Sequence, residues 1–462
     1  MQVAIIGTGY VGLTTGVCLA WLGHEVRCLD TDASKIDCLT RGECPIYEPH
    51  LSEMMAEVKT RLNFTTSYAE AIPEADVVFV AVGTPPSPDG SPDLKYLRAA
   101  AQSAGKHLGE NFTVVVNKST VPIGSGNWVE SLIRESFATH RGIKPDGRFA
   151  IASNPEFLRE GAALHDTLYA DRIVVGADSS RALEVLYTLY RPLLEQSFST
   201  PSYLPRPDGL GAVPMVATDL ASAELIKYAA NAFLALKISY INEIGQLAEK
   251  VGADVTLVAK GIGLDTRIGT RFLQAGLGWG GSCFGKDTAA LISTASDYGL
   301  GMPIVTAARE VNRRQRERVV EKLLAELKIL NGKTIGLLGL AFKPHTDDLR
   351  DAPSLEIAKA LATRGCKVLA HDPVAMDRAR REFPDVDIHY CATGEDVAHE
   401  ADALILVTDW PQYQTLDWAV MAQQMKAHGN AGTRLRILLD GRNFLDARRM
   451  EMTGFRLVRV TG

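Results

Sequence analysis

The chain begins with Val3-Ala4-Ile5-Ile6-Gly7-Thr8-Gly9-Tyr10-Val11-Gly12, a short apolar run that leads directly into a GxGxxG turn. The run predicts a buried strand, and the amphipathic segment that follows, as far as Leu22, predicts a helix. In such a unit the first glycine permits the tight turn, the second lets a pyrophosphate approach the backbone, and the third allows the helix to pack closely. The free N–H groups of the helix N-terminus favour an anionic ligand. A doubly wound α/β domain that binds a dinucleotide at Gly7, Gly9, Tyr10, Val11 and Gly12 is therefore expected.

A carboxylate stands where the ribose of that dinucleotide would lie. Asp30 ends the next predicted strand, Val26–Asp30, 23 residues after Gly7. A carboxylate at this position binds ribose hydroxyls and repels a 2′-phosphate, so the chain should prefer NAD to NADP. Lys35 follows and is expected to reach the adenosine side. A glycine turn without a nucleotide is the alternative, and this spacing disfavours it.

The alternation of apolar strands and helices continues and then returns near the C-terminus. Strands are expected at 76–82 and 113–116, and again at 334–340, 367–372, 403–407 and 435–440. Such a pattern indicates parallel sheets covered on both faces. Between the two sets, about Asp219 to Gly252 lacks proline and is apolar nearly all round, which predicts one long helix buried on several sides. A second long helix should run from Pro303 through Leu330.

The expected fold class is α/β, with two Rossmann-like doubly wound domains joined by a long-helix dimerisation domain. The boundaries that we expect are 1–213 for an NAD-binding domain, 214–318 for the helical central domain, and 319–462 for the second Rossmann-like domain. Ser199 to Pro214, with four prolines, should be a surface loop. Because monomers rarely expose large apolar patches, the long helix also predicts a homodimer.

Composition and charge narrow the class of protein. The chain has 462 residues, a hydrophobic fraction of 46% and a net charge of −6, which suit a soluble globular protein of two or three domains. It has no basic block that would favour nucleic acid and no apolar stretch of membrane-spanning length. The N-terminus does not resemble a signal peptide, and the seven cysteines are scattered without a metal-site spacing. We therefore expect a cytoplasmic protein with free thiols, no metal and no membrane or nucleic-acid partner.

The segment richest in chemistry is Gly276-Leu277-Gly278-Trp279-Gly280-Gly281-Ser282-Cys283-Phe284-Gly285-Lys286-Asp287. Its glycines let the backbone wrap closely around a ligand. Ser282 is expected to cap a helix, which would place Cys283 in the first turn, where the helix dipole favours a thiolate. Asp287, four residues on, would share its face. A lone cysteine is usually an inert buried thiol, but this setting favours a nucleophile.

Polar residues elsewhere show the same helical spacing. Lys227 and Asn231 share one face of the long apolar helix, where buried polar groups need partners. Glu156 and Glu160 are also four residues apart, within Asn154-Pro155-Glu156-Phe157-Leu158-Arg159-Glu160-Gly161. The loops Val82–Pro86 and Asn117–Pro122 each follow a predicted strand, so both lie at the sheet edge where ligands of α/β proteins bind. Taken singly, each feature is also compatible with an ordinary structural role.

At these residues the sequence closely resembles the UDP-glucose/GDP-mannose dehydrogenase family, and within it the UDP-glucose 6-dehydrogenases. The shared motifs run in order through essentially the whole chain: GTGYVGL, PIYEP (Pro45 to Pro49), VGTPP, KSTVP, NPEFLREG, ELIKYAANAFLALKISYINE, GWGGSCFGKD, AFKPHTDDLRDAPS (Ala341 to Ser354) and DGRN (Asp440 to Asn443). The resemblance implies NAD-dependent oxidation of the C6 alcohol of UDP-glucose to UDP-glucuronate by a homodimer.

The resemblance also implies a mechanism. NAD takes hydride from C6, Cys283 traps the aldehyde as a thiohemiacetal, a second NAD oxidises this to a thioester, and water hydrolyses the thioester. The implied catalytic residues are Cys283, Asp287 with Thr120 and a bound water for the proton, Lys227 and Asn231 for the oxyanion, and Glu156 as the hydrolytic base. The implied sugar-nucleotide contacts are Glu156, Phe157, Leu158, Glu160, Lys227, Asn231, Phe272, Gly276, Gly280, Phe342, Lys343 and Arg442, with Arg267 reaching the substrate of the partner subunit. The implied cofactor contacts, besides the glycine turn, Asp30 and Lys35, are Thr84, Pro85, Thr120, Glu160, Lys286 and Arg350.

Some departures from the family pattern bear on the substrate. Gly285 replaces a frequent proline, and Phe272 replaces a common tyrosine, which removes a possible hydrogen bond to phosphate. Ser282 stands where the UDP-N-acetylmannosamine enzymes tend to carry histidine, which favours UDP-glucose. The alternatives are the same chemistry on GDP-mannose or UDP-N-acetylmannosamine, a two-electron hydroxyacid or 6-phosphogluconate dehydrogenase, which needs no thiol, and a non-enzymatic NAD-sensing protein, which has no reason to keep this residue set.

Overall fold

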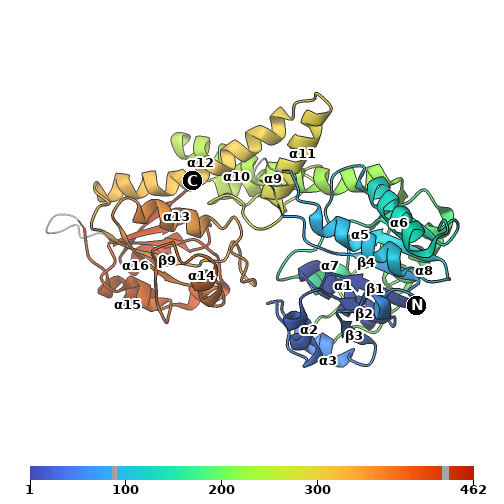
Figure 1. Cartoon of the computed structure of the whole chain (residues 1–462). Coiled ribbons are helices and arrows are strands. Elements are labelled where there is room, and N and C mark those ends of the chain that lie inside the picture. Colours follow the sequence, from blue (N-terminus) through green and yellow to red (C-terminus); the bar gives the residue numbers. More distant parts are fainter. Residues whose placement is uncertain (86, 88–90, 429–435, 462) are drawn as a thin grey trace. The chain divides into compact units, whose positions relative to one another are not determined.

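The computed structural model describes residues 1–85, 87, 91–428 and 436–461, which form two compact units (Figure 1). One unit contains Met1–Ala230 and Ala289–Tyr298, and the other contains Asn231–Thr288 and Gly299–Gly462. Each unit holds its own sheet, so the predicted α/β class with two sheets is confirmed. The division falls inside the long helix, and the three-domain boundaries at 213 and 318 stay a prediction.

The sheet of the first unit has the order β3-β2-β1-β4-β5-β6-β7-β8. Its strands are β1 (Gln2–Ile6), β2 (Glu25–Leu29), β3 (Leu62–Thr65), β4 (Val77–Val80), β5 (Thr113–Asn117), β6 (Phe149–Ser153), β7 (Ile173–Gly176) and β8 (Met215–Thr218). The first six are parallel. Strand β7 turns back antiparallel to β6 and pairs in parallel with β8, which the sequence pattern did not reveal.

Helices cover both faces of this sheet, which explains why its central strands β1, β4 and β5 are buried along nearly their whole length. Alternate residues of β1 enter opposite cores: Val3 and Ile5 join one cluster, and Ala4 and Ile6 join the other. The first cluster also takes residues from α1 (Tyr10–Trp21), α2 (Ala33–Thr40), α3 (Leu51–Glu57), α7 (Ala163–Leu168) and α8 (Ser180–Leu194). The second takes them from α4 (Tyr68–Ala71), α5 (Lys95–His107) and α6 (Ser125–Arg141).

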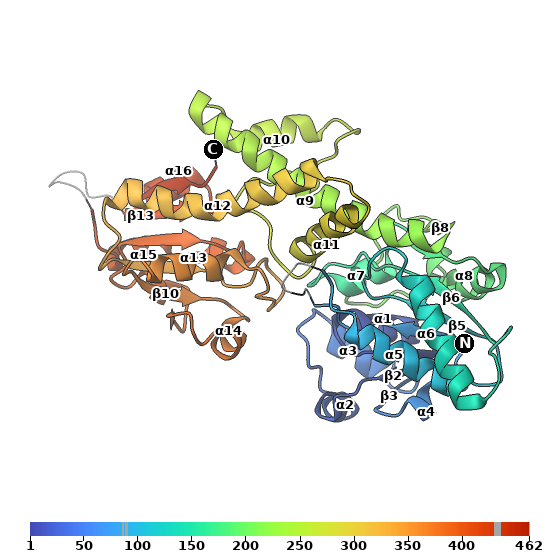
Figure 2. The same ribbon diagram turned by 45° about the horizontal axis from the view of Figure 1, so that its top comes forward.

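The second unit contains a parallel sheet in the order β11-β10-β9-β12-β13-β14. Its strands are β9 (Thr334–Leu338), β10 (Lys367–His371), β11 (His389–Tyr390), β12 (Ala403–Leu406), β13 (Arg436–Asp440) and β14 (Phe455–Arg459), and its helices include α12 (Pro303–Leu327), α13 (Pro353–Ala362), α14 (Met376–Glu382), α15 (Trp418–Gln424) and α16 (Ala447–Met452). Helix α12 runs along this sheet (Figure 2), because Val319, Leu323 and Leu327 join the sheet's own core. The second predicted doubly wound sheet is therefore present.

The long helix α9 spans Leu220–Val251, within one residue of its predicted bounds at each end, and α10 (Val255–Gly263) follows it. The single chain covers only part of the surface of α9, and burial of the rest at a subunit interface stays a prediction. Phe233, Tyr240 and Leu247, spaced seven residues apart, are 61%, 49% and 59% exposed. Residues at this spacing lie on one face of a helix, so α9 carries an uncovered apolar stripe. Among the described residues, no helix is long and apolar enough to cross a membrane.

The segment Ser199–Pro214 was expected to be a surface loop, and part of it packs against the core of the first unit. Tyr203, Leu204 and Leu210 contact the apolar cluster that contains α1 and α8. The Tyr169 hydroxyl donates to the Leu204 carbonyl at 2.7 Å. The segment lacks helices and strands, and its apolar side chains pack against the core of the first unit.

Candidate functional site

The glycine turn of the first unit has the geometry that its spacing predicts. Gly7 has φ = 99°, and a Cβ there would lie 2.7 Å from the Ala81 carbonyl oxygen. A Cβ on Gly12 would lie 1.9 Å from the Gly7 carbonyl oxygen, so the third glycine permits the contact between helix and turn. A Cβ on Gly9 would meet no atom within 4 Å. The backbone at Gly9 is therefore open to a ligand at the N-terminus of α1, which Tyr10 and Val11 begin.

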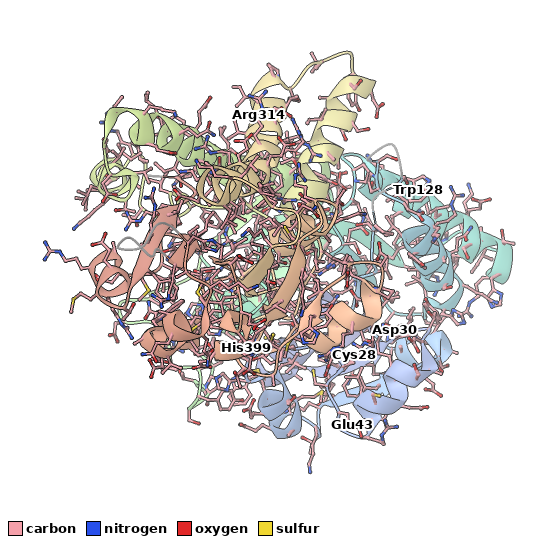
Figure 3. All side chains as sticks on the ribbon, turned by 90° about the vertical axis from the view of Figure 1, so that its left-hand side faces the viewer. Cys28, Asp30, Glu43, Trp128, Arg314 and His399 are labelled. Carbon is pink, nitrogen blue, oxygen red and sulfur yellow. The ribbon has the colours of Figure 1, made fainter. Side chains whose placement is uncertain are left out.

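Asp30, labelled in Figure 3, follows β2 directly, and its side chain is hydrogen-bonded to Thr8 of the glycine turn. Its Oδ2 accepts hydrogen bonds from the Thr8 amide at 2.9 Å, from the Thr8 hydroxyl at 2.8 Å and from Lys35 Nζ at 3.1 Å. Burial opposes ionisation, but the hydrogen bonds outweigh it and lower the pKa of Asp30. The carboxylate is thus ionised beside the turn. Lys35 pairs with Asp30, and its contact with the adenosine stays a prediction.

The two loops that follow β4 and β5 are joined to each other. The Thr84 hydroxyl donates to the Thr120 carbonyl at 2.8 Å, and the Ser119 hydroxyl donates to the Val82 carbonyl at 2.7 Å. This juxtaposition was expected from their position at the carboxyl edge of the sheet. Pro85 lies in the first loop, whereas Pro86 lies outside the described residues.

Glu156 and Lys227 form a buried ion pair in the same unit. Lys227 Nζ donates to Glu156 Oε1 at 2.8 Å and to the Glu156 carbonyl at 2.7 Å, and the two side chains are only 4% and 7% exposed. The Leu158 amide donates to Glu156 Oε2 at 2.9 Å, and Lys227 Nζ lies 5.5 Å from the centre of the Phe157 ring. Glu156 and Lys227, both predicted to be catalytic, are therefore in direct contact. Glu160 follows in a partly exposed turn.

In the second unit, Cys283 directly precedes helix α11 (Phe284–Asp297). The Asp287 amide donates to the Cys283 carbonyl at 2.8 Å, so Cys283 itself occupies the N-cap position. The expectation that Ser282 is the cap is therefore wrong by one residue, because the first helical hydrogen bond ends on Cys283. The thiol, partly exposed and 3.5 Å from the Ser282 hydroxyl, still lies at the positive end of the helix.

The carboxylate of Asp287 is fully buried and held at both oxygens. Oδ2 accepts from Asn231 Nδ2 at 2.6 Å, and Oδ1 accepts from Lys286 Nζ at 2.6 Å. Asn231 thus has the partner that its position on an apolar helix requires. Lys286, expected at the cofactor, is engaged by Asp287.

The glycine-rich segment before Cys283 touches the chain regions that the resemblance associates with the sugar nucleotide. The Gly281 amide donates to the Arg350 carbonyl at 2.9 Å, and a Cβ on Gly281 would lie 2.8 Å from the Phe342 ring. A Cβ on Gly280 would lie 2.3 Å from the Asp351 carbonyl oxygen, and one on Gly276 would lie 2.5 Å from that of Gly441. Side chains larger than hydrogen would push these segments apart.

The guanidinium of Arg442 is hydrogen-bonded to backbone carbonyls. It donates to the carbonyls of Val407 at 2.7 Å, Phe342 at 3.0 Å and Gly278 at 3.3 Å, and burial lowers its pKa. It thus ties the glycine-rich segment to the loop after β9. Within that loop, Lys343 Nζ lies 5.4 Å from the centre of the Phe342 ring.

The remaining predicted residues lie farther from this segment or have partners of their own. Arg350 pairs with Asp348 through Nε at 2.8 Å and a second nitrogen at 3.0 Å. Arg267 is 87% exposed and pairs with Asp265, so its predicted role at a partner subunit stays a prediction. Phe272 has φ = 64°, and its ring lies 6.2 Å from that of Phe284.

Several residues that hold these segments were missed by the sequence reasoning. In the first unit, Glu48 accepts from the Tyr10 hydroxyl and from the amides of Gly161 and Ala163, both at 2.6 Å. In the second unit, Asn242 Oδ1 accepts from the Gly276 amide, and Asn312 Oδ1 accepts from the Trp279 amide, both at 2.7 Å. Both asparagines are polar positions within long helices, the signal that identified Lys227 and Asn231. Glu48 stands in the quoted PIYEP motif. Within the described ranges, no group of three His, Cys, Asp or Glu residues is placed to hold a metal.

Comparison with known proteins agrees with this arrangement. Models described as the NAD binding, central and UDP binding domains of the UDP-glucose/GDP-mannose dehydrogenase family match residues 1–194, 221–314 and 336–447. The UDP-glucose 6-dehydrogenase of Rhizobium meliloti is 44% identical over 468 residues, covering 100% of this chain and 99% of that protein. The UDP-glucose 6-dehydrogenase TuaD of Bacillus subtilis is 41% identical over 456 residues, covering 98% and 92%. The structure of a UDP-glucose dehydrogenase from Pyrobaculum islandicum superposes with a TM-score of 0.86 at 38% identity, covering 99% and 97%.

Proposed function

Because the chain belongs to the UDP-glucose/GDP-mannose dehydrogenase family and is an NAD-dependent oxidoreductase of nucleotide sugars, we propose that it oxidises UDP-glucose to UDP-glucuronate through a covalent intermediate on Cys283. The observation that carries the proposal is the position of Cys283 at the N-terminus of α11, one turn before the buried Asp287–Asn231 pair. Relatives at about 40% identity over the full chain are UDP-glucose 6-dehydrogenases.

Residues of the first unit fit the cofactor. The open backbone at Gly9 and the N-terminus of α1 suit a pyrophosphate, and the ionised Asp30 suits ribose hydroxyls. Bound NAD supplies the hydride acceptor for each of the two oxidations. Thr84 and Thr120 lie on the joined loops at the same sheet edge, where they would border the nicotinamide.

The chain's own residues would then act on the sugar. Asp287, oriented by Asn231 and Lys286, takes the proton of the C6 hydroxyl through a water that Thr120 also binds. Transfer of the first C6 hydride to bound NAD would give the aldehyde. The thiolate of Cys283 would then add to C6 as the C=O π electrons move to oxygen, and transfer of the remaining C6 hydride to a second NAD would re-form C=O as a thioester. Lys227 and Asn231 donate to the oxygen that bears charge at each stage. Glu156 then takes a proton from the water that hydrolyses the thioester.

For the nucleotide sugar itself, UDP-glucose is the substrate that we favour. Gly276, Gly280, Phe342, Lys343 and Arg442 would form its nucleotide side, and Phe157, Leu158 and Glu160 would border the sugar. Ser282, in place of histidine, disfavours UDP-N-acetylmannosamine. GDP-mannose is the second candidate, because the family model covers both sugars.

We further propose that the active form is a homodimer in the cytoplasm. Besides the stripe formed by Phe233, Tyr240 and Leu247 on α9, Leu257 on α10 and Leu264 at its C-terminal end are 66% and 71% exposed. Burying these side chains against a second copy would remove apolar surface from water. A reducing compartment would keep the Cys283 thiol available.

The test is the stoichiometry of NADH with a panel of UDP-glucose, GDP-mannose and UDP-N-acetylmannosamine. We expect two NADH per UDP-glucose, with UDP-glucuronate as the product. One NADH per sugar with release of an aldehyde would contradict the thioester route. Binding of NAD without its reduction by any of these sugars would instead favour a non-enzymatic role.

A further inference from the structure

A small cavity lies behind Thr120 in the first unit. It is lined by Asn117, Ser119, Thr120, Val121, Ser153, Pro155, Glu224, Lys227 and Tyr228. About 10 Å³ of it is available to the centre of a water-sized sphere, which matches a single water molecule. Much of its wall is formed by the apolar parts of these side chains, so the partners of a water there would be a few polar groups, among them the amide of Asn117 and the carboxylate of Glu224.

Asn117, the last residue of β5, presents an unsatisfied amide to this cavity. Its side chain is only 1% exposed, and neither Oδ1 nor Nδ2 has a hydrogen-bond partner among the described residues. A buried amide without partners costs free energy, and nearly all such groups in folded proteins are paired with protein or with ordered water. The amide and the size of the cavity together indicate a bound water.

Glu224 borders the same cavity and connects two elements of the site. Its carboxylate is 3% exposed and accepts from the amides of Gly124 at 2.6 Å and Gly126 at 2.9 Å, at the start of α6. Burial raises the pKa of Glu224 to about 7, against the lowering effect of bonds from Gly124, Gly126 and Ser153. Residues 119–124 form the turn that carries Thr120, and Lys227 lies one helical turn after Glu224. The carboxylate therefore links the Thr120 turn to the helix that bears Lys227.

We propose that Asn117 and Glu224 bind one water molecule behind Thr120, and that Glu224 is a positioning residue that holds the Thr120 turn against α9. The water would bridge the Asn117 amide and the Glu224 carboxylate through hydrogen bonds. This bridge would fix the position of the Thr120 turn relative to β5. This inference rests on the proposed function in one respect: Thr120 and Lys227 act at C6 of the sugar. Neither Asn117 nor Glu224 would touch the substrate.

The first measurement is a crystal structure of the full chain with NAD, at a resolution that shows ordered water. We expect one water within hydrogen-bonding distance of the Asn117 amide and of a Glu224 oxygen. A dry cavity, or an Asn117 amide bonded to the protein instead, would overturn the water site. This result does not depend on which sugar the enzyme oxidises, so it stands or fails separately from the proposed function.

The second measurement compares kcat with KM for NAD in matched variants. Asn117→Val and Glu224→Gln should each lower kcat by roughly ten- to a hundredfold, as a misplacement near 1 Å does, with KM for NAD within about twofold. Asn117→Thr, which has the shape of the valine variant but carries a hydroxyl that can bond to the water, should recover most of the rate. The control is Thr113→Val at the other end of β5, which removes the hydrogen bond to the Ala75 carbonyl and should change stability but not kcat.

A purely structural role predicts a different pattern. If Asn117→Val and Thr113→Val lose kcat equally, the positioning role is overturned. The same follows if the kcat of Asn117→Thr is no higher than that of Asn117→Val. If Asn117→Val does not fold, Asn117→Thr and Glu224→Gln still decide, because an unchanged kcat in Glu224→Gln contradicts the proposal. If the wild type forms no NADH with any of the sugars, the proposed function is contradicted. The water site is then tested by the crystal structure, which does not depend on turnover.

Discussion

Replacement of Lys227 by methionine should destabilise the protein by about 3 to 5 kcal/mol, because it leaves the buried Glu156 carboxylate without its cationic partner. The Lys227 and Glu156 side chains are 4% and 7% exposed, so water cannot solvate Glu156 in place of the lost ammonium. The Glu156 carbonyl, 2.7 Å from Nζ, loses its donor as well. Within the part of the chain that the structure describes, the Leu158 amide at 2.9 Å is the donor that remains to the Glu156 carboxylate, and the charge of Lys118 acts on it only from a distance. Methionine keeps an unbranched apolar stem, so packing losses add little.

The assay is urea unfolding followed by circular dichroism, with the double variant Lys227→Met/Glu156→Gln beside the single one. The double variant should regain much of the lost free energy of unfolding, since a neutral amide replaces the stranded charge. It should not regain activity. The control is Lys322→Met. Its partner Glu249 is 29% exposed and keeps its ion pair with Arg318, so this variant should lose less than about 1 kcal/mol of the free energy of unfolding.

Two results would refute this reasoning. A loss below about 1 kcal/mol for Lys227→Met would mean that Glu156 is solvated or protonated in the folded state. A double variant no more stable than the single one would mean that the loss arises from packing and not from charge.

Four further outcomes are expected. Cys283→Ser should bind NAD and UDP-glucose but lose turnover by roughly a thousandfold or more, measured as NADH absorbance; turnover near that of the wild type would show that the thiol is structural. Asp30→Asn should raise kcat/KM for NADP by about tenfold, and a wild type that prefers NADP would contradict the ribose assignment. Because burial raises the pKa of Glu224 to about 7 from an ordinary 4.5, the folded state binds the extra proton between these values, so wild-type stability should fall as pH rises through that window. Glu224→Gln should remove that part of the slope between pH 4.5 and about 7, and an unchanged slope would place the titration elsewhere. Phe233→Glu with Leu247→Glu should convert a dimer into a monomer by light scattering, whereas a monomeric wild type would count against the α9 interface.

Local patterns were enough to predict the class of fold, the central strands of both sheets and the two long helices, but not the strands β3, β6, β7, β8, β11 and β14. The GxGxxG turn with Asp30 identified the first sheet and its cofactor, because glycine conformation and strand–helix packing are properties of a few adjacent residues. The bounds of α9 were predicted within one residue, since a stretch without proline that is far longer than an ordinary strand favours a helix. The lysine and asparagine on that helix were identified because polar groups among apolar neighbours require partners.

The partners themselves came only from the tertiary structure. Glu156 meets Lys227 across 71 residues of chain, and Asn231 meets Asp287 across 56, and no periodicity encodes such a pairing. The same holds for the reversed direction of β7, for the packing of Ser199–Pro214 against the core of the first unit and for the cavity at Asn117. Whether a residue is buried, and beside which charge, depends on how distant segments pack. The sequence alone determined which side chains need a partner, and the folded chain decided which partner each one has.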